Sequence, residues 1–114
     1  MDLAKMRCIP CAVGGSPLTK RRIVQYMRVL KPKGSWRVIY SKPRSGRLVR
    51  EYTFGDFVQA MRFVGKVAKV AEANGHHPDI QIHWNKVHLE LYTHSVGGLS
   101  ESDFIVASKI NLIK

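Results

Sequence analysis

Acidic residues are scarce in the first half of the chain, where Asp2 is the sole acid among residues 1–50 against 13 Lys and Arg. Residues 51–114 carry seven acids and six Lys and Arg, so the formal net charge of +11 comes from the first half. A basic face of this kind attracts nucleic acid, anionic lipid or an acidic protein. The absence of a nucleic-acid motif favours a merely solvated surface. An anionic macromolecular partner is the alternative.

Cysteine is limited to Cys8 and Cys11, which excludes a disulfide framework and suits a reducing compartment. Their C-x-x-C spacing has no second half nearby, which disfavours a zinc knuckle. Long apolar runs are also absent: no stretch approaches the roughly 18 residues that span a bilayer, and residues 1–7 lack the apolar core of a secretory signal. We expect a soluble protein of the cytoplasm or of an organelle interior such as the mitochondrion, not a secreted one.

The chain has 114 residues, 45% of them hydrophobic, which suits one domain over residues 1–114 with an extended segment at 1–15. Helical spacing, caps and Gly or Pro stops predict three helices, and alternating or β-branched runs predict four strands. The first helix runs from Ser16-Pro17 to Leu30, the second from a Thr53-x-x-Asp56 capping box to Asn74-Gly75, and the third from Ser100-x-x-Asp103 to Ile113; the strands cover 36–41, 47–53, 79–84 and 86–93. This order, α-β-β-α-β-β-α, predicts an α+β fold: a four-stranded antiparallel sheet with helices on one face.

The second helix is expected to bury one apolar stripe against the sheet. Its members recur at helical spacing: Phe57, Met61, Val64, Ala68 and Ala71.

All five histidines fall in the window from His76 to His94. His76 and His77 follow the stop of the second helix, and a hairpin should bring His94, at the far end of the last strand, back beside them. Imidazole titrates near pH 6.5, so a cluster of histidines can hold a base and an acid together at neutral pH. The spacing alone leaves two interpretations equally open: a functional cluster, for catalysis or metal binding, and a purely structural His-Pro corner.

Other residues near this cluster have simpler interpretations. Alternation places His83 and His88 off the apolar face, so we exclude them from the site. Asp103 fits the third position of a capping box as well as it fits a catalytic role, and Glu72 could merely solubilise a helix end.

A longer pattern joins these residues: Glu72-Ala-Asn-Gly-His76-His77-Pro78, then Trp84-Asn85-Lys86-Val87, Thr93-His94 and Gly97-Gly98-Leu99, ending at Asp103. It resembles the signature of the pterin-4a-carbinolamine dehydratase family. The similarity covers residues 47 to 112 well and residues 16–46 loosely, and Cys8-Ile-Pro-Cys11 is similar to the opening of some members.

The resemblance implies a lyase that eliminates water from 4a-hydroxytetrahydrobiopterin to give quinonoid dihydrobiopterin, in tetrahydrobiopterin recycling, with no metal and no cofactor. It implies that His76 and His94 are the acid and base, and that His77 binds the pterin and can share in proton transfer. Glu72 and Asp103 would bind the substrate or orient imidazoles, Thr93 would bind the substrate, and Trp84 would pack. It also implies a homodimer or homotetramer.

Two other classes of function stay open. The first is a dehydratase-like binding module without catalysis, acting in transcription-factor dimerisation or protein assembly. The second is a zinc site on the three histidines, which the lack of an H-E-x-x-H helix or a further cysteine disfavours.

Overall fold

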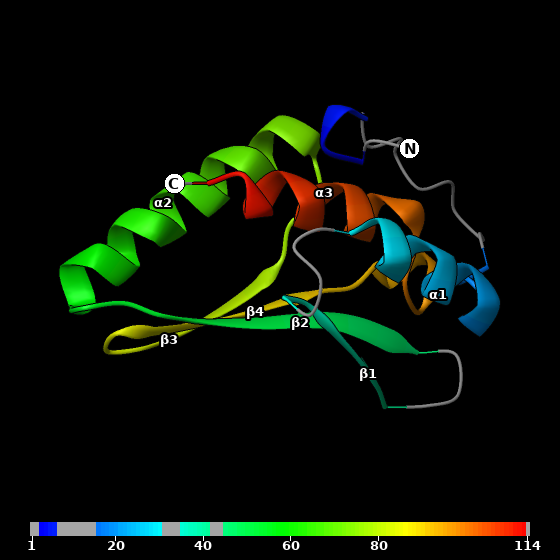
Figure 1. The fold of residues 1–114 in the computed structure, drawn as a ribbon, viewed down its shortest axis with the longest axis horizontal. Coiled ribbons are helices and arrows are strands. Elements are labelled where there is room, and N and C mark those ends of the chain that lie inside the picture. The colour runs from blue at the N-terminus through cyan, green and yellow to red at the C-terminus, as the bar shows by residue number, and fades with distance from the viewer. Residues whose placement is uncertain (1–2, 7–15, 31–34, 42–44, 114) are drawn as a thin grey trace.

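A four-stranded antiparallel sheet forms one layer of the structure, a computed structural model that describes residues 3–6, 16–30, 35–41 and 45–113 (Figure 1). One hairpin pairs β1 (Arg37–Tyr40) with β2 (Gly46–Thr53), and a second pairs β3 (Asp79–His83) with β4 (Lys86–Leu91). A ladder between β2 and β4 joins the hairpins in the order β1-β2-β4-β3. The predicted α+β fold is therefore confirmed, with β1 and β3 at the edges.

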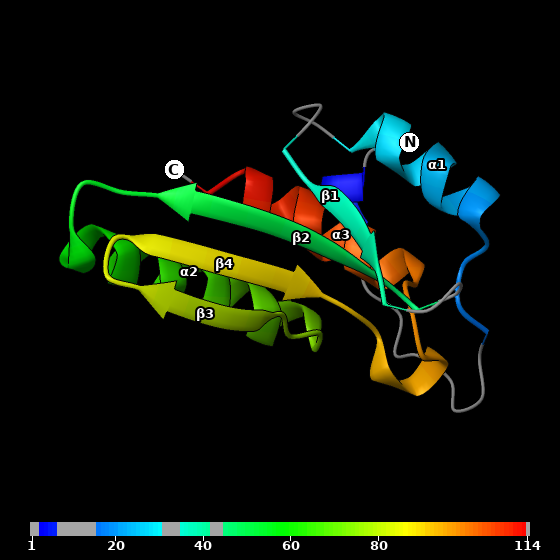
Figure 2. The same ribbon diagram turned by 90° about the horizontal axis from the view of Figure 1, so that it is seen from below.

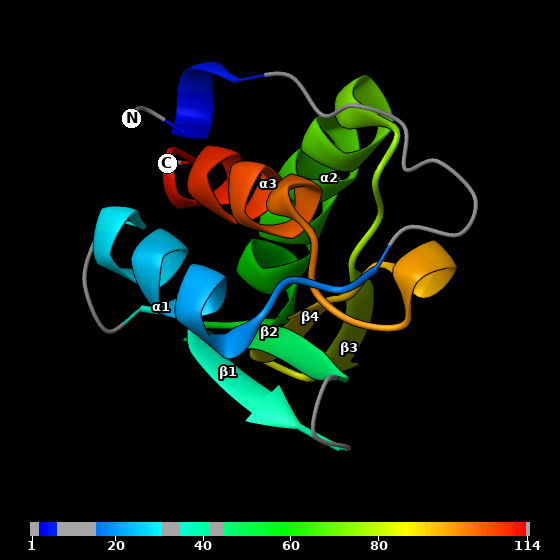
Figure 3. The ribbon, with the colours of Figure 1, turned by 90° about the vertical axis from the view of Figure 1, so that its right-hand side faces the viewer.

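The helices α1 (Lys20–Val29), α2 (Phe57–Asn74) and α3 (Glu101–Asn111) all lie on one face of this sheet, as Figures 1 and 3 show. Figure 2, viewed from below, shows the other face, which no described helix covers. Within the described ranges, no helix combines the length and the apolarity needed to cross a membrane.

Two short 3-10 turns complete the described chain: η1 (Leu3–Lys5) and η2 (His94–Val96). Leu3 is buried and η1 lies against α3, so the expectation of an extended segment over residues 1–15 is wrong at this turn. Cys8 and Cys11 lie outside the described residues.

The core lies between the sheet and its helices. Alternation along β4 buries Val87, Leu89 and Leu91, while His88 and Glu90 point to the opposite face, as predicted. All three helices contribute buried side chains to it, including Ile23, Tyr26, Ala60, Phe63, Val67, Phe104, Ile105 and Ile110.

The first helix begins later than predicted. Its N-cap is Thr19, whose hydroxyl accepts from the N–H of Arg22 at 3.3 Å, and not Ser16. The N–H of Leu18 bonds to the carbonyl of Leu99 at 2.8 Å. This long-range bond holds the chain extended before Thr19, a tertiary effect that the local Ser-Pro signal does not contain.

The predicted stripe on α2 is wrong for Phe57, Met61 and Ala68, because the helix is rotated about its axis; Ala71 is buried, and Val64 is half-buried and packs against the core. The helix buries Ala60, Phe63, Val67 and Ala71, while Phe57 and Met61 are 47% and 41% exposed. Apolar residues occur on both sides of this helix, so two stripes compete for the sheet. Aromatic packing decides between them: the Phe63 ring lies 4.3 Å from that of Tyr52 and 5.1 Å from that of Phe54, centroid to centroid.

Two further details of the hairpin and helix start differ from expectation. Trp84 does not pack: it is 65% exposed and adopts a left-handed conformation (φ 53°) in the turn between β3 and β4. Thr53 belongs to β2, and Asp56 is the N-cap of α2, accepting from the N–H of Gln59 at 2.8 Å.

The rotation of α2 predicts unequal effects of one substitution at two sites. Val67→Ala, which removes two buried carbons, should lower the free energy of unfolding by about 2 kcal/mol. Val58→Ala, at a site that is 55% exposed, should change it by less than about 0.5 kcal/mol. Urea denaturation of both variants measures this, and equal losses would contradict the observed orientation of the helix.

Candidate active site

A sharp corner after α2 sets the direction of His76 and His77. Gly75 ends the helix in the left-handed conformation (φ 61°), and its N–H bonds to the carbonyls of Ala71 and Glu72. The N–H of His76 adds a bond to the carbonyl of Ala71 at 3.2 Å. The predicted stop at Asn74-Gly75 is confirmed, and the reversal brings the His76 side chain to the start of α3.

Asp103 connects three distant parts of the chain. It lies in the first turn of α3 and is fully buried. Its Oδ2 accepts from the N–H of Ser100 at 2.9 Å and from the hydroxyl of Thr93 at 2.7 Å. Its Oδ1 lies 2.5 Å from Nε2 of His76. Asp103 therefore caps the helix and orients the imidazole at the same time, since Oδ2 accepts from the backbone of the helix start and Oδ1 contacts His76.

The chemistry of this contact fixes the tautomer of His76. An ionised carboxylate only accepts hydrogen bonds, so Nε2 of His76 is the donor to Asp103. In a neutral ring the other nitrogen, Nδ1, then carries the lone pair that can accept a proton. The His76 side chain is 13% exposed, so this ring is held in place and still reaches the surface.

A small closed loop carries His94 beside this network. Thr93 is buried and bridges to Gly98, with its N–H bonded to the Gly98 carbonyl at 2.9 Å. The turn between them exposes His94, whose ring makes a T-shaped contact with the Tyr92 ring at 4.7 Å between centroids and 88° between planes. The Arg47 guanidinium lies 4.6 Å from the centroid of the Tyr92 ring. Tyr92 therefore packs against His94, a contact that the sequence patterns do not predict.

His77 pairs with Glu72 one helical turn earlier, its Nε2 lying 2.7 Å from the carboxylate. Both side chains are largely exposed, at 59% and 78%, so this pair contributes little to stability. The exposure leaves both groups accessible to a bound molecule.

The structure thus joins three of the six predicted residues, His76, Thr93 and Asp103, in one hydrogen-bonded network. His77 and Glu72 form a separate exposed pair next to it, and His94 follows Thr93 directly along the chain. Among the described residues, no group of three or more His, Cys, Asp or Glu side chains is arranged to hold a metal ion.

His88 lies on the open face of the sheet, between Glu51 at 3.2 Å and Glu90 at 2.9 Å. The hydrogen bond from His88, aided by Arg47, lowers the pKa of the Glu90 carboxyl. His83 is exposed at the end of β3. Neither side chain joins the network around Asp103.

Comparison with known proteins identifies the family. The model of the family described as pterin 4 alpha carbinolamine dehydratase matches residues 16–113. The chain belongs to this family. A relative from Alkaliphilus metalliredigens is 39% identical over 96% of this chain and 94% of its own length. A relative from Rickettsia bellii is 41% identical over 99% and 95%. Both bear the name "Putative pterin-4-alpha-carbinolamine dehydratase".

Two solved structures share the fold of this dehydratase family member. A transcriptional coactivator/pterin dehydratase from Brucella melitensis is 30% identical and superposes with a TM-score of 0.72 over 84% of this chain and 96% of that one. A pterin dehydratase-like protein described as a RuBisCO assembly factor in the alpha-carboxysome is 26% identical, with a TM-score of 0.56 over 68% of this chain and 86% of that one. Proteins that share this fold are therefore named for assembly as well as for chemistry.

The network predicts that Asp103 is needed for stability and for the state of His76. In Asp103→Asn an amide N–H₂ replaces one acceptor oxygen, so one donor loses its partner and the free energy of unfolding should fall by about 1–3 kcal/mol. Nitrogen NMR of the neutral ring should show His76 as the Nε2–H tautomer in the wild type and not in the variant.

Asp56→Asn is the matched control, because Asn caps an exposed helix as well as Asp does. The control should melt like the wild type. An Asp103→Asn variant that also did so would contradict the role assigned to the network.

Proposed function

We propose that this protein is a 4a-hydroxytetrahydrobiopterin dehydratase of tetrahydrobiopterin recycling, with His76 and His94 as its acid and base. The observation that carries the proposal is the buried Asp103 carboxylate, which holds His76 in one tautomer and binds Thr93 beside His94. Family membership supports the substrate class, because the relatives are named for the carbinolamine of a pterin.

The proposed reaction needs two proton transfers. A proton is added to the hydroxyl on C4a, and the C4a–O bond breaks to release water. The proton on N5 is removed, and its bonding electrons form the C4a–N5 double bond of the quinonoid product. One imidazole in its neutral form and one in its protonated form supply these transfers near neutral pH.

Each residue of the site receives one proposed role. His76, oriented by Asp103, takes or gives a proton through Nδ1, and His94, on its exposed turn, acts on the opposite side of the reacting atoms. His77 and Glu72 bind the pterin ring at the surface, where their exposed pair can exchange its hydrogen bonds for bonds to the ring. Asp103 orients the His76 imidazole, and Thr93, which bonds to Asp103, is the residue directly before His94.

A binding module without catalysis is the second candidate function. It is favoured by the assembly factor that shares this fold, although that protein is 26% identical to this chain. Self-association as a homodimer or homotetramer stays a prediction under both functions, as does an anionic partner for the basic half.

Turnover should depend on the proposed acid and base. His76→Ala and His94→Ala should each lower turnover of synthetic 4a-hydroxytetrahydrobiopterin by about 10²–10⁴-fold, the usual effect of losing a positioned acid or base. His83→Ala and His88→Ala are the controls and should stay near wild-type turnover, measured where circular dichroism shows all four variants folded. Equal losses in all four would contradict the assignment, and no turnover in the folded wild type would favour the binding module.

Activity should not require a metal ion. Because positioned imidazoles are sufficient for both proton transfers, exhaustive chelation should leave the turnover of the wild type unchanged. Turnover that disappears on chelation and returns with zinc would replace the acid/base mechanism with metal catalysis.

A further inference from the structure

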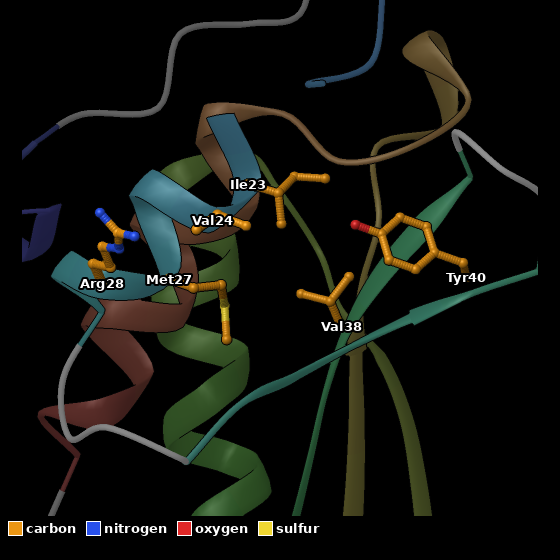
Figure 4. A pocket seen from close by; sticks show the side chains of 6 residues that line it. All are labelled: Ile23, Val24, Met27, Arg28, Val38 and Tyr40. Carbon is orange, nitrogen blue, oxygen red and sulfur yellow. The ribbon is translucent and has the colours of Figure 1, made fainter. Parts of the chain in front are cut away.

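An apolar pocket of about 410 Å³ opens between α1 and β1, and it shares no residue with the candidate active site. Figure 4 shows side chains of α1 facing side chains of β1 across it. The lining residues are Ile23, Val24, Met27 and Arg28 of α1 and Val38 and Tyr40 of β1. Its size is within the range of roughly 300–1,000 Å³ that is typical of pockets that bind ligands.

The pocket is open to solvent on its outer side. Val24 is 50% exposed and Tyr40 is 39% exposed. β1 is an edge strand, so no further strand of the sheet extends beyond it. Exposed apolar side chains gathered in one depression are typical of a surface that another molecule covers.

The two elements that form the pocket are strongly basic. They carry Lys20, Arg21, Arg22, Arg28 and Arg37 and no acidic residue. Arg22 is engaged with Gln25 and Tyr26, and the Lys20 ammonium lies 5.3 Å from the centroid of the Tyr40 ring at the pocket. Within the described ranges, none of these five cations forms an ion pair with an acid.

We propose that the α1–β1 surface, meaning this pocket with Lys20 and Arg21 beside it on α1, binds an acidic segment of a partner protein that inserts apolar side chains between α1 and β1. Carboxylates of the segment would neutralise cations that have no acidic partner in the described structure, and its apolar side chains would cover the aliphatic lining. Opposite charges across an interface speed association and select the partner.

Charge and shape favour this occupant over two others. A second copy of the chain would bring the same basic surface and a net charge of +11 against it, which is repulsive. A nucleic acid would match the charge, but it lacks the aliphatic groups to fill a pocket lined by Ile23, Met27 and Val38. Single strands bind mainly by stacking on several aromatic rings, whereas Tyr40 is the one aromatic side chain in this lining.

The test uses the full chain and a short fluorescein-labelled peptide of Glu and Ser with two Leu. Fluorescence anisotropy should show binding that weakens as salt is added. A peptide with Ser in place of both Leu, and a peptide with Lys in place of Glu, should each bind much more weakly. Equally tight binding of either control peptide would overturn the proposal, because charge or apolarity alone would then explain the binding.

Matched variants locate the binding on the protein. Val24→Ser should weaken peptide binding by about tenfold, because it removes an apolar side chain that the bound peptide would cover. Arg28→Gln should weaken it by at least about threefold. Their controls are Val58→Ser and Arg62→Gln on α2, which also replace an exposed valine and an exposed arginine and should leave binding unchanged.

The proposal would be overturned if the α2 variants weakened binding as much, or if a single-stranded oligonucleotide bound at the same residues more tightly than the peptide. It would also be overturned if Val24→Ser dissociated a homodimer seen by light scattering, because a second copy would then occupy the pocket. Dehydratase turnover should be unchanged in Val24→Ser and Arg28→Gln, which separates this surface from the proposed active site.

Discussion

Asp103 is a fully buried carboxylate, and it must therefore collect hydrogen-bond donors from wherever the fold can supply them. It finds the N–H of Ser100 in its own helix start, the hydroxyl of Thr93 after β4, and the imidazole of His76 after α2. Loss of any one donor would leave a buried acceptor poorly satisfied. The same requirement that stabilises the start of α3 thus holds the strand end and the helix corner together, and these segments carry His94 and His77.

Local patterns were sufficient to predict the fold, because each pattern is typical of one structure. Two examples are the alternation in 79–83 and 86–91, which is typical of strands, and Gly75, which is typical of a helix end. The start of α1 and the buried side of α2 could not be predicted, since the bond from Leu18 to Leu99 and the packing of Phe63 on Tyr52 join residues distant in sequence. At the site, the residue types identified His76 and Asp103, but not that one carboxylate serves the helix and the imidazole at once. Tyr92 was missed, and its place directly before Thr93-His94 was the available signal.

The candidate active site and the basic surface lie on different parts of the molecule. His76, His77 and His94 lie with Glu72 and Asp103 where α2, β4 and α3 meet, whereas most described cations of the first half lie on α1 and the first hairpin. A small pterin needs positioned imidazoles and gains little from a distant basic face. The basic face with its apolar pocket instead suits a larger, acidic molecule, so chemistry and association can be altered independently.

The most direct test of the account is a nitrogen–proton NMR titration of the wild type with 7,8-dihydrobiopterin, a pterin that lacks the 4a-hydroxyl group. The account predicts that the largest shift changes occur at residues 72–77, 93–98 and 100–103, including the imidazole signals of His76 and His94. Changes centred on α1 and β1, or no changes at concentrations that saturate a known dehydratase, would contradict the placement of the pterin beside Asp103.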